Sequence, residues 1–107
     1  MKVVFAAKAR VQLDEIWDYN ARTYGAGHAG EYIEFLLSGI EELAKEGTDG
    51  RTVDGFPLLR AKTLKRGRRG HGHVVIYQVD EDAGIVKIWS VFHTRQDVEG
   101  RLRRDFS

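Results

Sequence analysis

The stretch VFHTRQD, residues 91–97, places an imidazole, a hydroxyl, a guanidinium and a carboxylate directly after a run of apolar residues. A ribonuclease that works without a metal needs a base for the 2′-hydroxyl, an acid for the leaving oxygen and cations for the phosphorane. His93 and Arg95 could supply part of that set. In the alternative interpretation, His93 ends a strand, Arg95 pairs with a nearby carboxylate, and Asp97 begins a helix whose dipole favours its negative charge. The motif by itself is compatible with both.

Two further histidines, His71 and His73, stand on either side of Gly72, where a strand is expected to begin. Residues i and i+2 of a strand lie on the same face, so the two imidazoles should point the same way. An unperturbed imidazole titrates near pH ~6.5, which suits a general acid or base. A metal would need a third ligand, for which only His93 or Asp97 is a candidate, and we predict no metal site. Polar residues at the entry of a strand are the simpler interpretation.

The segment RAKTLKRGRRG, residues 60–70, carries basic side chains and no acidic one. Such clustering suggests a surface for phosphates or for an acidic partner, and charge alone would read phosphates rather than a base sequence. The alternative is a solvated edge strand that uses charge to resist aggregation. Residues 1–57 carry ten acidic and six basic side chains, whereas residues 58–107 carry six acidic and eleven basic ones. The basic residues of the run are Arg60, Lys62, Lys65, Arg66, Arg68 and Arg69.

The composition fits a single domain over residues 1–107, with 42% hydrophobic residues to build a core. The sequence has no cysteine, which excludes disulfides, thiolate metal sites and cysteine nucleophiles. No apolar stretch approaches the ~20 residues of a membrane span. The N-terminal MKVVFAAKAR is too short and too soon charged for a signal peptide. We therefore expect a cytoplasmic protein that uses no cofactor and does not contact a membrane.

Apolar spacing predicts two helices that pack as an antiparallel hairpin. The first covers residues 7–24 and ends at GAG, and the second follows the helical rule over residues 29–44. Phe35 falls off the stripe of the second helix and is expected to be exposed to a partner. The residues expected to be buried are Ala9, Leu13, Ile16, Trp17 and Tyr24 in the first helix, and Ala29, Tyr32, Ile33, Leu36, Leu37, Ile40, Leu43 and Ala44 in the second.

The remaining pattern predicts strands. A short strand at 2–6 precedes the helices and a loop at 46–57 follows them. Strands are then expected at 58–67, 71–79 and 85–93, the last two joined by the turn DEDAG, and a polar helical segment ends the chain. The prediction is an α+β fold of order β-α-α-β-β-β with a short C-terminal segment, in which the helical hairpin packs on a mainly antiparallel sheet.

Both faces of the two long strands are apolar, so the sheet has two faces that must be covered. A helical hairpin can cover only one face. The other face must be covered by the C-terminal segment, a second copy or another protein, and we expect it to be left for another protein. By alternation, one face holds Val86, Ile88 and Phe92 and the other Ile85, Trp89, Val91 and His93, while Val74 and Ile76 oppose Val75, Tyr77 and Val79.

HVVIYQVD followed by IVKIWSVFHTRQD resembles the two closing strands, and the histidine after them, of the RelE/ParE toxin superfamily of bacterial toxin–antitoxin modules. The resemblance covers nearly the whole chain. Ribosome-dependent nucleases of this superfamily often carry arginine three residues before the tyrosine of the middle strand. Here Val74 stands in that place ahead of Tyr77, so the sequence is more similar to the ParE branch. The helices match at Ala9, Leu13, Ile16 and Tyr19, and at Ala29, Tyr32, Leu36, Ile40 and Leu43.

The resemblance implies a ParE-like toxin that poisons DNA gyrase by binding it, without a catalytic residue, and that serves plasmid stabilisation. A cognate, ParD-like antitoxin would neutralise it in a hetero-oligomer by wrapping a helix and an extended segment around it, and would itself carry DNA binding. The contact residues would then be Arg60, Lys62, Arg66, Arg68, Trp89, His93, Arg95 and Asp97.

Two alternatives remain open. The first is a RelE-like, metal-independent mRNA endoribonuclease that binds nucleic acid directly and uses His71, His73, His93 and Arg95. The second is a binding module without toxicity.

Overall fold

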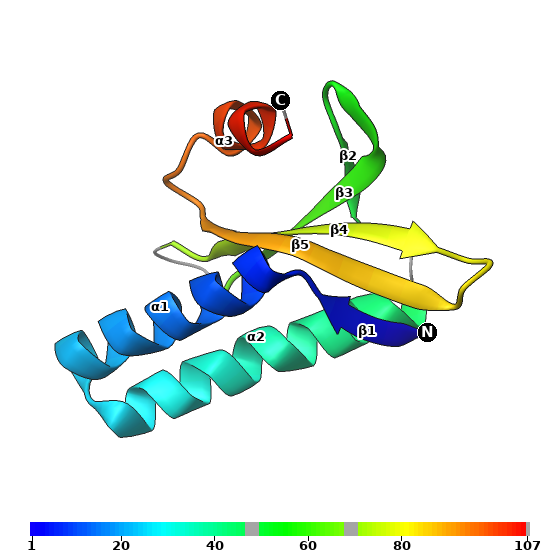
Figure 1. The fold of residues 1–107 in the computed structure, drawn as a ribbon. Helices are drawn as coiled ribbons and strands as arrows, with labels where there is room; N and C mark the ends of the chain where they lie inside the picture. Colours follow the sequence, from blue (N-terminus) through cyan, green and yellow to red (C-terminus); the bar gives the residue numbers. More distant parts are fainter. Residues whose placement is uncertain (47–49, 68–70, 107) are drawn as a thin grey trace.

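The computed structural model describes residues 1–46, 50–67 and 71–106, and its helices and strands are grouped along the chain as expected for an α+β fold (Figure 1). The predicted fold class is confirmed. Within the described residues, every helix is too short or too polar to span a bilayer. The elements are β1 (Lys2–Phe5), α1 (Ala7–Tyr24), α2 (Ala26–Glu46), β2 (Arg51–Val53), β3 (Phe56–Leu64), β4 (His73–Asp80), β5 (Ile85–His93) and α3 (Val98–Asp105).

The strands form one sheet in the order β1-β5-β4-β3-β2. Its pairs are antiparallel except that β1 runs parallel to β5, from Lys2 opposite Ile85 to Phe5 opposite Ile88. Because β1 stops there, the second half of β5 has no strand on its outer side within the described residues. This short first strand creates the edge on which the candidate site lies.

The helical hairpin turns at a single glycine. Gly25 has a φ of +96°, and its N–H donates to the carbonyl of Ala21 at 2.9 Å, which ends α1. A residue without a Cβ adopts this left-handed backbone at little cost. The helix α2 begins at the next residue, Ala26, so the break is shorter than the predicted GAG and the second helix starts earlier than residue 29.

One face of the sheet packs on this hairpin and forms the larger core. Its buried members include Ala9 and Ile16 from α1, Leu36, Ile40 and Leu43 from α2, and Val75, Tyr77, Val86 and Ile88 from the sheet. The prediction that Trp17 and Tyr24 are buried is wrong, since they are 40% and 61% exposed. The stripe that faces the sheet runs through Ile16 and Asn20 instead, and Trp17 lies about 100° around the helix from Ile16.

Two predictions for α2 are also corrected. Phe35 is half-buried rather than exposed, because it packs against the larger core and its ring stacks on Tyr32 at 5.8 Å. Leu37, expected to be buried, is 37% exposed.

The predicted loop at 46–57 contains a strand. Arg51–Val53 pairs with β3 in an antiparallel hairpin, and Val53 lies opposite Phe56 across the two residues Asp54 and Gly55. Gly55 has a φ of +81°. Asp-Gly is a strong signal for a two-residue hairpin turn, because glycine accepts the left-handed backbone that the turn requires. The pattern was present in the sequence but its first strand is only three residues long.

A bulge in β5 changes which residues share a face. The β4–β5 register shifts between Ile76 and Tyr77, so that Ile76 pairs with Ser90 and Tyr77 with Ile88, and Trp89 is left without a partner. An extra residue reverses the alternation beyond it. Val91 therefore joins the core under the helices and Phe92 joins the opposite face, which contradicts the simple alternation predicted for this strand.

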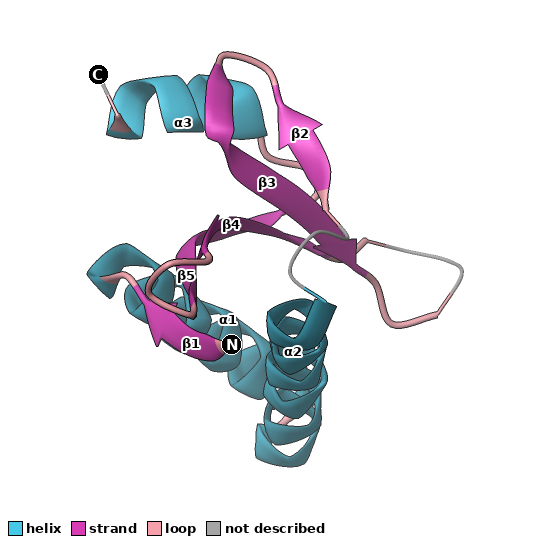
Figure 2. Ribbon diagram, turned by 90° about the vertical axis from the view of Figure 1, so that its right-hand side faces the viewer, coloured by secondary structure: helices cyan, strands magenta, loops and turns pink. Residues whose placement is uncertain are grey.

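The second face of the sheet is closed by the chain itself. Helix α3 lies on the side opposite α1 and α2 (Figure 2), and its Val98 and Leu102 are buried. They pack in a second cluster with Val53, Leu59, Ala61, Val74, Ile76 and Phe92. The expectation of an apolar face left for another protein is therefore wrong.

Replacing Leu102 by alanine tests how much α3 contributes to the fold. Leu102 is fully buried, so Leu102→Ala should lower the free energy of unfolding by about 2–5 kcal/mol in a urea titration. The exposed neighbour in Arg103→Ala is the control and should change it by less than about 0.5 kcal/mol. Equal stabilities for Leu102→Ala and the wild type would mean that α3 does not seal the sheet.

Candidate functional site

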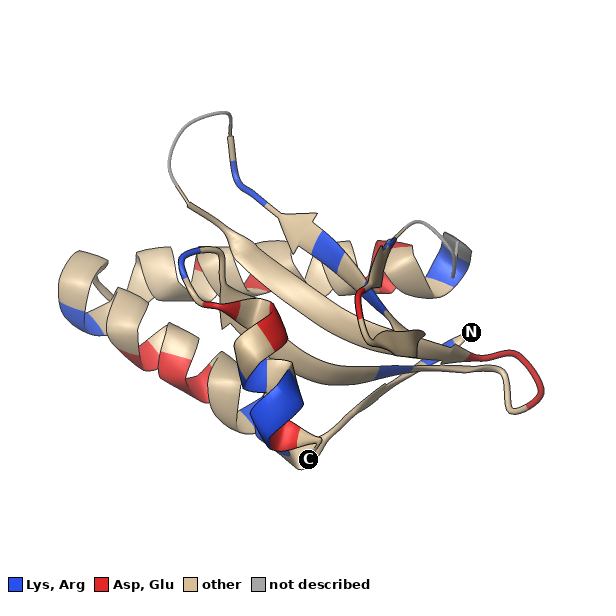
Figure 3. Ribbon diagram, turned by 90° about the horizontal axis from the view of Figure 1, so that it is seen from above, with Lys and Arg blue, Asp and Glu red and all other residues tan. Residues whose placement is uncertain are grey.

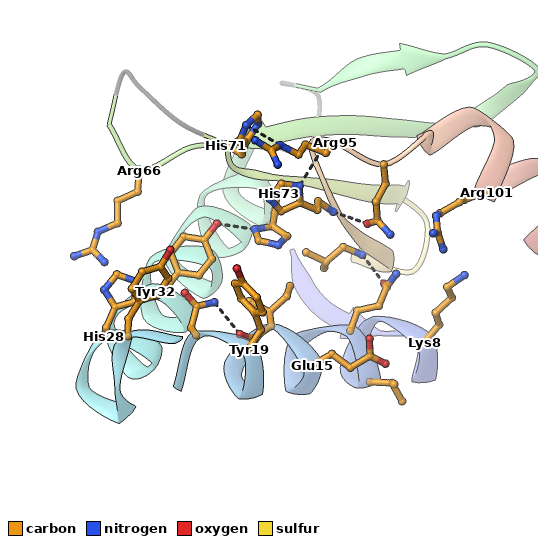
Figure 4. Close-up of a pocket in the computed structure, with 18 residues that line it drawn as sticks. Lys8, Glu15, Tyr19, His28, Tyr32, Arg66, His71, His73, Arg95 and Arg101 are labelled. Carbon is orange, nitrogen blue, oxygen red and sulfur yellow. Dashed lines mark hydrogen bonds between the residues drawn. The ribbon is translucent and has the colours of Figure 1, made fainter. Parts of the chain in front are cut away.

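A groove of about 1120 Å³ runs between α1 and the end of the sheet where β4 begins and β5 ends. Figure 4 shows His71, His73 and Arg95 on the strand side, facing Lys8, Glu15 and Tyr19 on α1. All four histidines of the sequence line it, including His28 from the start of α2. The chain thus gathers its imidazoles, from positions far apart in sequence, along one open surface.

The pairing of β4 with β5 brings three of these imidazoles into contact. His73 lies directly opposite His93 in the register, and their ring centroids are 5.3 Å apart. His71, just before β4, has its ring centroid 5.5 Å from that of His93 on the other side. Both His71 and His73 line the groove, but His71 lies before β4 rather than in the strand as expected.

Gly72 makes this arrangement possible. Its N–H donates to Thr94 Oγ1 at 3.2 Å, and its carbonyl accepts from the Thr94 N–H at 3.1 Å. A Cβ at this position would collide with the backbone carbonyl of Leu64. A glycine is therefore required where the chain passes close to the end of β3.

Arg95 is held by two imidazole nitrogens. Its backbone N–H donates to His93 Nδ1 at 3.1 Å, and its side-chain Nε donates to His71 Nε2 at 2.9 Å. An accepting ring nitrogen carries no proton, so the proton of neutral His93 lies on Nε2. Burial, and then the charges of His71 and Arg95, lower the pKa of His93. The expected pairing of Arg95 with a carboxylate is replaced by these bonds.

His73 makes a structural contact with α2. Its Nδ1 lies 2.6 Å from Tyr32 Oη. Burial, with a smaller effect from His93, lowers the pKa of His73 to about 4, so the ring is neutral at pH 7 and shares one hydrogen bond with the tyrosine hydroxyl. Burial likewise raises the pKa of Tyr32 against the opposing charge of Arg66. An acid–base catalyst works best with a pKa near the working pH, and His73 is far from it.

Two glutamine side chains occupy the outer edge of β5. The N–H of Val91 donates to Gln12 Oε1 and that of His93 to Gln96 Oε1, both at 2.7 Å. A buried N–H without a partner is costly. The two side-chain amides accept the hydrogen bonds that a longer β1 strand would otherwise accept.

The α1 wall is aromatic and the rim of the groove is cationic. Tyr19 and Tyr24 are 58% and 61% exposed, and the Tyr24 ring lies 4.7 Å from that of His28. Among the residues that the structure describes, four cationic side chains line the groove against one carboxylate, that of Glu15. The cations are Lys8, Arg66, Arg95 and Arg101.

The predicted contact residues include some that line the groove and some that lie away from it. His71, His73, His93, Arg95 and Arg66 line the groove. Arg68 lies outside the described residues. The other predicted residues, Arg60, Lys62, Trp89 and Asp97, lie away from it.

The described members of the basic run do not form one surface. Arg60 is half-buried on β3 and its Nη1 donates to the carbonyl of Gly50 at 3.1 Å. Lys62 is half-buried on the same strand, opposite Val75. Lys and Arg positions are spread over helices, strands and loops in Figure 3. Instead, Lys8 and Arg101 line the groove, and Lys8 comes from the acidic half of the sequence, residues 1–57.

Asp97 and Trp89 have structural roles. The Asp97 side chain accepts from the Gly100 N–H at 3.2 Å and caps α3, so the interpretation of Asp97 as the start of a helix is confirmed. Trp89 lies on the face covered by α3, with its Nε1 donating to Gln78 Oε1 at 3.2 Å and Lys87 Nζ 4.0 Å from the ring centroid.

Sequence reasoning missed the α1 wall and Arg101. The available signal was a second stripe on the first helix at intervals of three or four residues, which the apolar stripe concealed. The members of the second stripe are Lys8, Gln12, Glu15 and Tyr19.

Within the described part of the chain, no three histidine, aspartate or glutamate side chains are placed to hold a metal ion.

Comparison with known proteins identifies relatives of this architecture. A family model described as "ParE toxin of type II toxin-antitoxin system, parDE" matches residues 3–98. Among solved structures, the chromosomal ParDE toxin–antitoxin system of P. aeruginosa superposes with a TM-score of 0.70 at 20% identity, covering 86% of this chain and 94% of the other. The intact E. coli RelBE toxin–antitoxin complex gives 0.55 at 20% identity, covering 89% and 98%. No curated protein sequence is significantly similar to this chain.

The Tyr32–His73 contact should make stability depend on pH. Unfolded His73 binds a proton below its ordinary pKa of 6.5, whereas the folded ring resists protonation until about 4. Stability contributed by the neutral ring is therefore lost as the pH falls through this window, by about 2–3 kcal/mol between pH 7 and about pH 4.5. Urea titrations should show a smaller loss in His73→Gln than in the wild type, while His28→Gln, with an exposed ring, keeps the wild-type loss. Equal losses in all three proteins would contradict the contact.

Substituting Gly72 tests the close approach to β3. Gly72→Ala should lower the free energy of unfolding by about 1–3 kcal/mol, because the new methyl group forces the backbone at Leu64 to shift. Gly30→Ala is the control: a Cβ at Gly30 in α2 meets nothing within 4 Å and should be neutral or stabilising. Thermal unfolding of both variants measures the difference, and a stable Gly72→Ala protein would show that the passage is not tight.

Proposed function

The chain belongs to the family of ParE toxins of type II toxin–antitoxin systems, and on that basis we propose that it inhibits DNA gyrase by binding it and is neutralised by a cognate antitoxin. The match of the family model to residues 3–98 carries the proposal. The antitoxin would be ParD-like, since the family description names the parDE system. We expect the toxin to act in the cytoplasm, where its proposed target works.

The surroundings of the histidines support binding rather than hydrolysis. Val74, at the position where nucleases of the superfamily often carry arginine, is buried under α3 and is only 4% exposed. A valine there stabilises no phosphorane. His73 has a pKa of about 4, and one nitrogen each of His71 and His93 is engaged by Arg95. These imidazoles serve chiefly to hold Arg95 and Tyr32.

Exposed cations at the rim suit contact with a target. Arg66 and Arg95 are exposed, and both lie in the groove with His93. Charged groups around an interface raise the association rate and fix its orientation. Arg66, His93 and Arg95 are therefore the strongest of the predicted contact residues.

A metal-independent endoribonuclease is the second candidate, and His93 favours it. His93 lines the groove, where its imidazolium form would protonate a leaving oxygen, and Arg95 lies beside the ring to stabilise negative charge. A nuclease would also need a base with a pKa nearer 7 than that of His73.

The two candidates are separated by parallel assays on the purified protein. We expect inhibition of plasmid supercoiling by gyrase, with mRNA on translating ribosomes left intact. Arg95→Ala should raise the inhibitory concentration about tenfold by removing an exposed contact cation. Arg103→Ala, which removes an exposed charge outside the groove, should raise it less than about twofold.

The proposal fails if ribosome-bound mRNA is cleaved and the cleavage disappears in His93→Ala, which would establish the nuclease. It also fails if neither supercoiling nor mRNA is affected by a folded protein, which would leave a binding module without toxicity.

A further inference from the structure

Helix α3 carries a basic outer surface that lies apart from most of the groove. We propose that this surface binds the phosphate backbone of duplex DNA without reading the base sequence. The inference rests on the proposed function, because gyrase, the proposed target, supplies the DNA. The residues of this α3 surface are Arg101, Arg103 and Arg104 of the helix and Lys87 of β5.

The buried side of α3 determines which of its residues face outward. Leu102 is fully buried against the sheet. At about 100° per residue, Arg101 and Arg103 lie on either side of it, and Arg104 points almost directly away from the sheet. All three arginines are exposed. Figure 3 views the molecule from the side on which α3 lies, with the Lys and Arg positions of that helix in blue.

Contacts on both flanks hold α3 in place. Asp105 pairs with Lys8 of α1 on one flank. On the other, Phe106 follows the helix and packs against Trp89 and Phe56, with ring centroids 5.3 Å and 5.9 Å away. The arginines therefore project from a helix that is already fixed, and a bound duplex would not have to order the backbone that carries them.

The chain's own carboxylates leave much of this positive charge uncompensated. The carboxylate of Asp105 is engaged by Lys8. Within the described residues, no carboxylate pairs with Arg101 or Arg103. Lys87 adds a cation near the end of α3, with its Nζ 4.0 Å from the ring centroid of Trp89. The net charge of the chain is only +1, so attraction for a polyanion would come from this local concentration of cations.

The α3 surface lacks the apolar centre that a contact with another protein would use. The apolar residues of the helix, Val98 and Leu102, are buried beneath it, and Phe106 is packed against two other rings. Protein–protein interfaces have an apolar core inside a polar rim, whereas protein–DNA interfaces are more polar and more positively charged. A row of arginines without an apolar centre therefore fits phosphates better than an acidic protein.

The DNA contact would add to the gyrase interface rather than replace it. Salt screens exposed charges, and most of the affinity for the target would come from contacts with the gyrase protein. Loss of one cation, as in Arg103→Ala, is therefore still expected to leave supercoiling inhibition within about twofold. The contribution of the α3 surface is measured directly with DNA alone and with two cations removed together.

Fluorescence anisotropy of the full-length toxin with a fluorescein-labelled DNA duplex tests the inference. The duplex has about 30 base pairs of arbitrary sequence, and binding is measured from about 50 to 200 mM KCl. We expect binding that weakens with salt. Arg103→Gln combined with Arg104→Gln should weaken it about tenfold at the lowest salt and reduce the slope of log K against log[KCl] by about two.

The matched control combines Arg22→Gln with Lys45→Gln. These substitutions also remove two exposed cations from last helical turns, those of α1 and α2, on the other side of the sheet (Figure 2). The change in net charge and the effect on a helix dipole are therefore the same, and DNA binding should weaken less than about twofold. Glu99→Gln, which removes a carboxylate from α3 itself, should tighten binding.

Four results would overturn the inference. The first is wild-type DNA binding by the α3 double variant, and the second is equal weakening by the two double variants, which would show that only net charge matters. The others are tighter binding of a labelled polyglutamate or of an RNA duplex that depends on Arg103 and Arg104, which would assign the surface to an acidic protein or to RNA. Circular dichroism of each variant confirms that folded proteins are compared. Because the assay contains no gyrase, supercoiling inhibition and DNA binding can fail separately.

Discussion

The register between β4 and β5 is the constraint on which the rest of this structure depends. Antiparallel pairing sets His73 opposite His93, and the bulge at Trp89 decides which later side chains face the helices. Without the bulge, Phe92 would point into the core under α1 and α2, and Val91 would point toward α3. One extra residue thus divides the apolar side chains of β5 between two cores and turns the end of the strand toward the groove.

Closure of the second face by α3 changes where a partner can bind. Only Val98 and Leu102 of this helix are buried, yet they complete a cluster that includes Val74, Ile76 and Phe92. An antitoxin that occupied this face would have to displace α3 and repay the cost of exposing those residues. A groove that is already open, with fixed cations and exposed tyrosines, requires no such rearrangement.

Elements that a local sequence pattern marks were predicted correctly, whereas features that depend on contacts between distant segments were not. The strand at 85–93 and the helix at 7–24 were found to the residue, because a continuous apolar run and a clear period mark them. The strand at 51–53 was missed, since three residues show no alternation, although Asp54-Gly55 marked its turn. Burial of Trp17 depended on where α1 meets β5, which no local pattern records.

The candidate site shows the same limit. The His71, His73, His93 and Arg95 cluster was predictable as a set of residues, but their roles follow from pairing geometry. Lys8 and Arg101 enter the groove from opposite ends of the chain, and no spacing rule connects them. The packing of α3 on the second face of the sheet was not predicted for a related reason. A helix with two apolar residues among charged ones has the sequence pattern of a solvent-exposed C-terminal segment.

The histidines of this groove connect the fold to its proposed binding role. A guanidinium that is free to move loses side-chain entropy when it binds a carboxylate, whereas Arg95 is already restrained by His71 and by the turn after His93. His71 and His93 accept these bonds at nitrogens that carry no proton, and burial lowers the pKa of both His73 and His93, which favours their neutral forms. Burial therefore does two things at once. It removes His73 from acid–base chemistry, and it leaves the arginines as the dominant positive groups that a partner meets.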